Sequence, residues 1–230
     1  VRAVAEGRAM WRSVRDAVSI LTGGNFGEIG FTLLTSLLDR PPLNARQLLL
    51  VNLLTDIAPS LSLVMRRPDD DDLHNAVQAG PEVELGEELD RQILNRALTT
   101  TGGASLAWFS SRLWLGGLGR APTVALLSLV GTQLGQTLAI NRPTRETALA
   151  SIGSAALLLG LVETPGVSHL FGCRPVGPIG LATAATTSAI ATGASLAAPP
   201  LFKKTVELND QLRQKLHELG NTPQIPGFGD

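Results

Sequence analysis

The chain has 230 residues, a formal net charge of −1, and only 17% charged and 4% aromatic residues. The charges are crowded into short blocks, and residues 121–141 and 176–202 contain none. Uncharged runs of this length are typical of a polytopic membrane protein, and without a basic stripe a nucleic-acid partner is excluded. The single cysteine, Cys173, excludes an internal disulfide.

The first 38 residues predict a stalk that leads into a membrane span. Residues 1–17 carry four arginines among apolar residues and predict a cytosolic stalk. Residues 18–38 contain no ionisable residue except Glu28 and predict a span. Asn25 and Glu28 are three residues apart, so they share a helix face at mid-depth. The nearby glycines, at positions 23, 24, 27 and 30, are typical of helices whose backbones pack closely.

A second span is predicted over residues 47–65, where Asp56 is the only ionisable residue. Asn52, Thr55 and Asp56 follow one another at i, i+3 and i+4, so they project from one helix face. Pro59 lacks an N–H and deprives the Thr55 carbonyl of its helical hydrogen bond. The pattern therefore predicts a cluster of carboxylate, amide and carbonyl oxygens at mid-membrane, and these are the ligands of a hard cation.

The two spans are joined by a short turn at residues 39–42, so residues 18–66 form an antiparallel ion-binding hairpin. This hairpin brings Glu28 and Asp56 near each other. Facing carboxylates repel each other, and the pair implies a bound cation, a shared proton or both in alternation. The alternative that the pattern leaves open is a kinked helix whose polar residues bond to neighbouring helices.

The remaining residues predict a connector, four further spans and a tail. Residues 67–96 are rich in Asp and Glu and form a cytosolic connector, residues 97–202 contain the spans, and residues 203–230 form a cytosolic tail with an amphipathic helix ending at Gly220. The four spans are drawn at about 97–118, 121–141, 147–162 and 179–198. Most Lys and Arg residues then lie on the side of the stalk, connector and tail, which places both termini in the cytosol.

The third and fourth spans contain tryptophan, arginine and glutamine residues whose positions predict particular contacts. Trp108 and Trp114 indicate an interfacial belt, with Arg112 reaching the same membrane surface. Gln133 and Gln136 share one face of the fourth span, and we expect Gln136 to form an interhelical hydrogen bond.

These motifs resemble the carboxyl-terminal membrane half of a type II P-type cation ATPase, the family of the sarco/endoplasmic reticulum calcium pump. The sequences that carry the resemblance are EGRA at residues 6–9, NFGE at residues 25–28, and VNLLTD at residues 51–56 followed by Pro59. The resemblance implies an all-α, polytopic transmembrane bundle of six helices that correspond to spans five to ten. It also implies a set of metal ligands, namely Asn25, Glu28, Asn52, Thr55, Asp56 and Gln133. Gln133 stands where the calcium pump has a glutamate, which removes one carboxylate.

The resemblance further implies a multi-pass protein of the cell membrane that carries a transported cation, most simply a divalent one. Mg-ATP would act only through phosphorylation, nucleotide-binding and actuator domains. These domains and the first four spans would belong to the same polypeptide and would be the partners of this chain, together with the lipid bilayer. The chain begins at Val1 rather than at Met, and we expect it to be a piece of that longer polypeptide. It contains no motif for a catalytic or cofactor-binding residue, so we expect no ATPase activity from it alone.

Two other functions compete with an ATP-driven cation pump. An ion-coupled secondary transporter would also use mid-membrane carboxylates and broken helices, but the stalk motif argues against it. A non-transporting, degenerate pump scaffold would keep the fold without the ligands. The retained Asn25, Glu28, Asn52 and Asp56 argue against that alternative.

Overall fold

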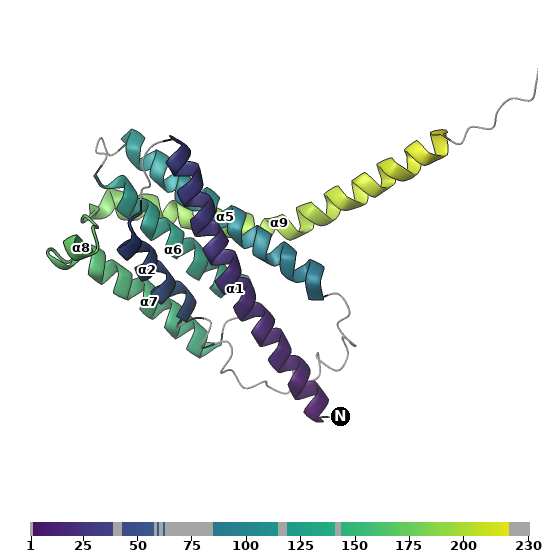
Figure 1. Ribbon diagram of the computed structural model, residues 1–230, viewed down its shortest axis with the longest axis horizontal. Coiled ribbons are helices and arrows are strands. Elements are labelled where there is room, and N and C mark those ends of the chain that lie inside the picture. Colours follow the sequence, from purple (N-terminus) through teal and green to yellow (C-terminus); the bar gives the residue numbers. More distant parts are fainter. Residues whose placement is uncertain are drawn as a thin grey trace, which may run out of the picture. The chain divides into compact units, whose positions relative to one another are not determined.

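The computed structural model describes residues 2–38, 43–57, 59, 62, 85–114, 119–140 and 144–220. These residues form helices and their connections, with no strand, as expected for an all-α protein (Figure 1). The chain divides into two compact units, Val1–Leu196 and Ala197–Asp230. The predicted turn at residues 39–42, nearly all of the second span after residue 57 and the connector up to residue 84 lie outside the described residues.

Helix α1 (Arg2–Leu38) covers the predicted stalk and first span as one continuous element. Its 37 residues correspond to a length of about 55 Å at 1.5 Å per residue. No proline interrupts it, but its five glycines would each weaken an isolated helix by up to about 1 kcal/mol. Packing against a neighbouring helix must therefore supply part of its stability.

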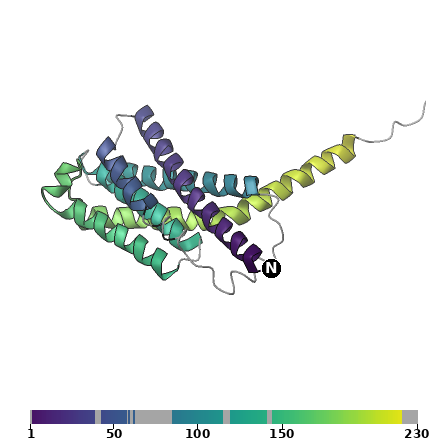
Figure 2. The ribbon, with the colours of Figure 1, turned by 60° about the horizontal axis from the view of Figure 1, so that its bottom comes forward.

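That neighbour is α5 (Leu85–Trp114), which packs against α1 and crosses it obliquely in both views (Figures 1 and 2). A methyl group on Gly27 would lie 2.7 Å from Cβ of Thr100, and one on Gly23 would lie 2.7 Å from Cβ of Arg96. The hydroxyl of Thr101 donates to the Gly27 carbonyl at 3.0 Å. These glycines are needed because the two backbones approach too closely for any side chain between them.

We expect Gly27→Ala to destabilise the chain, because its methyl group would overlap Thr100 and overpacking costs about 1–3 kcal/mol. Gly7→Ala is the matched control, since a methyl group at Gly7 meets nothing within 4 Å. In the control, alanine should instead improve helix propensity by up to about 1 kcal/mol. Thermal unfolding of both variants in one detergent measures the difference. Equal midpoints for the two variants would mean that close packing of α1 on α5 is not required.

The predicted second span begins as α2 (Ala45–Asn52). Asn44 caps this helix, because its side-chain oxygen accepts from the N–H of Gln47 at 2.9 Å. The Gln47 side-chain oxygen in turn accepts from the N–H of Asn44 at 2.9 Å, which completes a capping box. After Asn52 the chain continues as a π-helix, η1 (Leu53–Ile57). The regular helix is therefore interrupted at the segment that carries Thr55 and Asp56.

Helix α5 differs from the prediction in two ways. It begins at Leu85, inside the segment interpreted as a connector, because residues 87–96 contain good helix formers and neither glycine nor proline. Trp108 is only 4% exposed and belongs to the core, so its interpretation as an interfacial belt residue is wrong. The Arg112 guanidinium lies 4.6 Å from the Trp108 ring centre. Trp108 is buried because α5 packs against both α1 and α6.

Helix α6 (Ala121–Ile140) is the centre of the first unit, since it contacts α1, α2, η1, α5 and α7. Its side chains Val124, Leu126 and Leu129 are fully buried. Helix α7 (Arg145–Glu163) and the short α8 (Val167–Leu170) follow. Helices α6 and α7 lie where the fourth and fifth spans were predicted.

The last helix, α9 (Gly177–Gly220), ends at the predicted glycine but includes Pro199 and Pro200, where we expected a break before a separate tail helix. Proline leaves the carbonyl four residues earlier without its helical donor, which for Pro199 is the carbonyl of Ser195. The side-chain nitrogen of Asn95 in α5 donates to this carbonyl at 2.9 Å. A side chain from another helix thus replaces the lost backbone bond.

Among the described residues, two helical segments are long and apolar enough to cross a membrane, Arg145–Glu163 and Gly177–Ala198. The six-span arrangement therefore stays a prediction. Helices α1, α5 and α6 contain many buried glycine, threonine and glutamine residues, which lower their hydropathy. Such residues are compatible with a bundle interior, where a helix faces other helices rather than lipid.

Candidate cation site

Glu28 projects from α1 and is only 6% exposed. When the Asn52 amide is oriented with its nitrogen toward Glu28, that nitrogen lies 3.0 Å from each carboxylate oxygen. The side-chain nitrogen of Gln133, in α6, lies 3.4 Å from Oε1 of Glu28. The carboxylate of Glu28 therefore lies between amide groups of two other helices, and the residue of the predicted second span that contacts it is Asn52.

Asp56 lies within the π-helix η1 and is 8% exposed. The Thr55 hydroxyl lies 3.1 Å from Oδ1 of Asp56 and also donates to the Val51 carbonyl at 2.9 Å. Asn25 in α1 is exposed, and its side-chain nitrogen donates to the Leu21 carbonyl of its own helix at 2.7 Å. Single π-turns are frequent at functional sites because they redirect side chains and free backbone groups.

Gly24 has a role at this site that the sequence analysis missed. A methyl group at Gly24 would lie 3.2 Å from the side-chain nitrogen of Gln133 and 3.7 Å from Oδ1 of Asp56. Its carbonyl accepts from Gln133 at 3.3 Å. Gly24 therefore faces the site, whereas Gly23 and Gly27 face α5. The signal in the sequence is its i, i+4 spacing to Glu28, which places both residues on one face.

The two glutamines of α6 differ in the partner of their side-chain nitrogen. Gln136 donates to the hydroxyl of Thr99 in α5, which confirms the predicted interhelical hydrogen bond. Gln133 is 4% exposed, and its side-chain oxygen, like that of Gln136, is buried without a hydrogen-bond partner among the described residues. A buried acceptor without a donor costs about 1–3 kcal/mol. Its cost would be offset by a cation, which an amide oxygen can ligate.

The electrostatics of the site are those of two buried carboxyl groups among neutral amides and hydroxyls. In the described part of the chain, no basic side chain forms an ion pair with Glu28 or Asp56. The same residues contain no group of three or more His, Cys, Asp or Glu side chains suited to a metal ion. The arrangement can therefore hold a cation through mixed carboxylate and neutral oxygens, or hold protons on the carboxylates.

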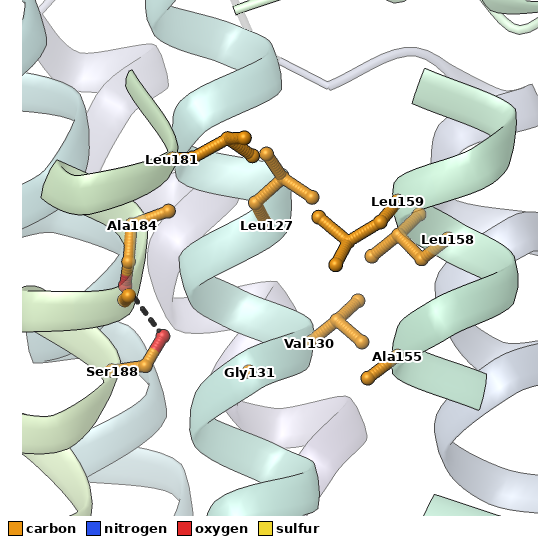
Figure 3. Close-up of a pocket in the computed structure, with 10 residues that line it drawn as sticks. Leu127, Val130, Gly131, Ala155, Leu158, Leu159, Leu181, Ala184 and Ser188 are labelled. Carbon is orange, nitrogen blue, oxygen red and sulfur yellow. Dashed lines mark hydrogen bonds between the residues drawn. The ribbon is translucent and has the colours of Figure 1, made fainter. Parts of the chain in front are cut away.

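A separate pocket of about 330 Å³ lies between α6, α7 and α9 (Figure 3). Leucine, valine, alanine and glycine line it, together with the hydroxyl of Ser188. That hydroxyl donates to the Ala184 carbonyl at 2.7 Å. The pocket contains no carboxylate, so it does not provide the ligands for a cation.

Residues 40–198 match the family described as the cation-transporting ATPase C-terminus. The probable cation-transporting ATPase I of Mycobacterium leprae is 41% identical over 221 residues, which covers 88% of this chain and 14% of that protein. The protein of the same description from Mycobacterium tuberculosis is 42% identical, covering 89% of this chain and 14% of its own length. The calcium-transporting ATPase 1 of Bacillus cereus is 28% identical over 75% of this chain and 22% of that protein.

The chain thus spans about one seventh of the length of the mycobacterial relatives. The match runs through η1 and α6, and it sets aside the secondary-transporter alternative. Its family consists of integral membrane proteins, in agreement with the uncharged runs and the two apolar helices. The chain belongs to the P-type cation-transporting ATPases, and it corresponds to their carboxyl-terminal membrane region.

Proposed function

We propose that this chain is the membrane transport part of an ATP-driven cation pump and that its buried carboxylates bind the transported cation. The observation that carries the proposal is the position of Gln133 from α6 beside both carboxylates. Its side-chain nitrogen lies 3.4 Å from Oε1 of Glu28, and the face of Gly24 that meets this nitrogen also meets Oδ1 of Asp56. Asn25, Asn52 and Thr55 complete the proposed ligand set. An intramembrane carboxylate is costly and is retained where it meets an ion, a proton or a partner.

The charge of the site favours one divalent cation per cycle. Glu28 and Asp56 together neutralise two positive charges, and the third position is the neutral Gln133. Charge count and ligand number set the affinity of an oxygen site for a hard divalent ion. The calcium-transporting relative from Bacillus cereus supports a divalent substrate, and calcium and manganese are therefore the first ions to test.

We propose a six-span topology in the cell membrane with both termini cytosolic. Lys and Arg residues are concentrated in the stalk, the connector and the tail, as the positive-inside rule requires. Leu149 and Ile152 of α7 and Ile179 of α9 are exposed in the chain by itself, which fits contact with lipid. ATP hydrolysis would be carried out by domains outside these residues, and transport would follow from alternating access to the site.

The function is tested by Gln133 variants in the full-length pump that contains this chain. Gln133→Ala should weaken the apparent cation affinity about fivefold and leave transport intact, because a neutral ligand contributes about 1 kcal/mol. Gln133→Glu should tighten binding of divalent ions, because it adds a full charge in a low-dielectric site. The assay is phosphoenzyme formation from ATP against the concentration of calcium or manganese.

The control is Gln136→Ala, since Gln136 lies on the same helix but bonds to Thr99 rather than to Glu28. It should leave the apparent affinity near that of the wild type. If Gln133→Ala abolished transport while Asp56→Asn did not, the neutral Gln133 would matter more for transport than the charged Asp56, contrary to the proposal.

A further inference from the structure

The Asn44 end of α2 is attached to a segment that is distant in sequence and that we call the 170–173 segment (Leu170, Phe171, Gly172 and Cys173). Three side chains at this end donate hydrogen bonds to three consecutive carbonyls of that segment. They are Arg46 Nη1 to Leu170 at 2.8 Å, Asn44 Nδ2 to Phe171 at 3.2 Å and Gln47 Nε2 to Gly172 at 3.2 Å. The Gln47 nitrogen also lies 3.4 Å from the Cys173 sulfur.

These carbonyls are available because the 170–173 segment ends helix α8. The last carbonyls of a helix lack intrahelical donors. Gly172 has a φ of 70°, its N–H donates to the His169 carbonyl at 3.0 Å, and the Cys173 N–H donates to the Ser168 carbonyl at 2.8 Å. This is a Schellman termination, which needs a residue such as glycine at positive φ. A methyl group at Gly172 would also meet Nδ2 of Asn44 and would displace that side chain.

The chain immediately after this segment is itself attached to the bundle. The N–H of Arg174 donates to the Thr123 hydroxyl at 3.1 Å, at the start of α6. The N–H of Val176 donates to the Glu163 carboxylate at 3.1 Å, at the end of α7. The segment therefore connects α2 to α6 and α7, which lie outside the hairpin.

Gln47 is the central residue of this attachment, because it is 1% exposed and its two amide atoms have different partners. Its oxygen caps α2 through Asn44, and its nitrogen holds the 170–173 segment. The same short helix carries Asn52 and leads directly into η1. A helix that is fixed at one end and interrupted at the other can change its geometry chiefly at the interruption.

We propose that Gln47 is a positioning residue, which fixes the Asn44 end of α2 to the 170–173 segment and so sets the position at which Asn52 and Asp56 face Glu28. The inference rests on the proposed function, since it concerns the same cation site. On this proposal, the π-helix η1 is the part of the hairpin that moves during transport, and the Asn44 end of α2 is the part that stays fixed.

Gln47→Glu separates the two roles of this side chain. A glutamate keeps the oxygen that completes the capping box, so α2 stays capped. It loses the nitrogen that donates to Gly172. We therefore expect the apparent cation affinity of the full-length pump to fall about fivefold or more, because couplings between two sites in a protein are typically at least of this size. Asn44→Asp is a second variant with the same logic, because it keeps the cap and loses the bond to Phe171. Ala45→Glu is the charge control, since it adds a carboxylate at an exposed position of the same turn.

Cys173 reports on the attachment directly. It is buried, and burial raises the pKa of its thiol, so it should react slowly with maleimide at neutral pH. Labelling is read by mass spectrometry of the peptide that contains Cys173. Gln47→Glu and Asn44→Asp should raise the labelling rate and weaken the apparent cation affinity together, and Ala45→Glu should do neither.

Faster labelling of Cys173 with an unchanged apparent cation affinity would overturn the inference, because the attachment would then be structural only. Unchanged labelling in both variants would overturn it as well, since the attachment would not depend on these amides. A failure of the proposed function would give results that differ from these two outcomes. In that case the wild-type pump would show no cation-dependent phosphorylation, or Asp56→Asn would behave like the wild type.

Discussion

Asp56→Asn is expected to eliminate cation-dependent phosphorylation from ATP in the full-length pump while leaving the protein folded. Asparagine keeps the shape of the side chain and its contact with the Thr55 hydroxyl, but it removes the charge. In a low-dielectric site a full charge contributes far more to cation binding than a dipole does. The measurement is phosphoenzyme formation against calcium, manganese, magnesium and monovalent ions, on the wild type and the variant side by side.

Glu163→Gln is the matched control for this experiment. It makes the same carboxylate-to-amide change at the end of α7, and glutamine keeps the oxygen that accepts from the Val176 N–H. The control should retain the ion dependence of the wild type. If Asp56→Asn also retained it, the carboxylate would be structural and η1 would be only a kink in the second helix.

Glu28→Gln is expected to weaken the apparent affinity for a divalent cation at least about 100-fold, because leaving one charge of a buried interacting set uncompensated costs about 3 kcal/mol or more. The substitution should be tolerated by the fold, since the Asn52 amide can rotate to present its oxygen to the new amide nitrogen. Titration of phosphoenzyme formation with calcium and manganese measures the shift. Unlike Asp56→Asn, this variant should still saturate at high cation concentration.

Glu28→Asp tests whether charge or reach matters at this position. Aspartate keeps the negative charge but shortens the side chain by one methylene group. It should restore part of the affinity lost in Glu28→Gln, because Coulomb attraction falls only gradually with distance. Wild-type affinity in Glu28→Gln would show that Glu28 is not a ligand and that its amide neighbours serve helix packing.

The sequence predicted the irregular helix at the candidate site. Asn52, Thr55 and Asp56 share a helix face through spacing alone, and the nearby Pro59 indicated that the helix would be irregular there. The structure interrupts the regular helix at Leu53–Ile57, just before that proline. The sequence predicted that the hairpin brings Asp56 near Glu28, whereas the side chain of the hairpin that contacts Glu28 is Asn52.

Features that depend on distant parts of the chain could not be predicted in the same way. Asn44 and Phe171 are 127 positions apart, and nothing in either motif indicates that they meet. The burial of Trp108 depends on α6 covering α5, whereas its composition suggested a membrane surface. The site-facing position of Gly24 became clear only once α6 supplied Gln133. In each case the missing information was the arrangement of helices.

Equilibrium binding of radioactive calcium or manganese to the purified full-length pump tests whether Glu28 and Asp56 together hold one divalent cation. We expect one bound ion per wild-type pump and no specific binding to Asp56→Asn at concentrations that saturate the wild type. Equal binding by the wild type and Asp56→Asn would mean that the Asp56 carboxylate does not hold the cation.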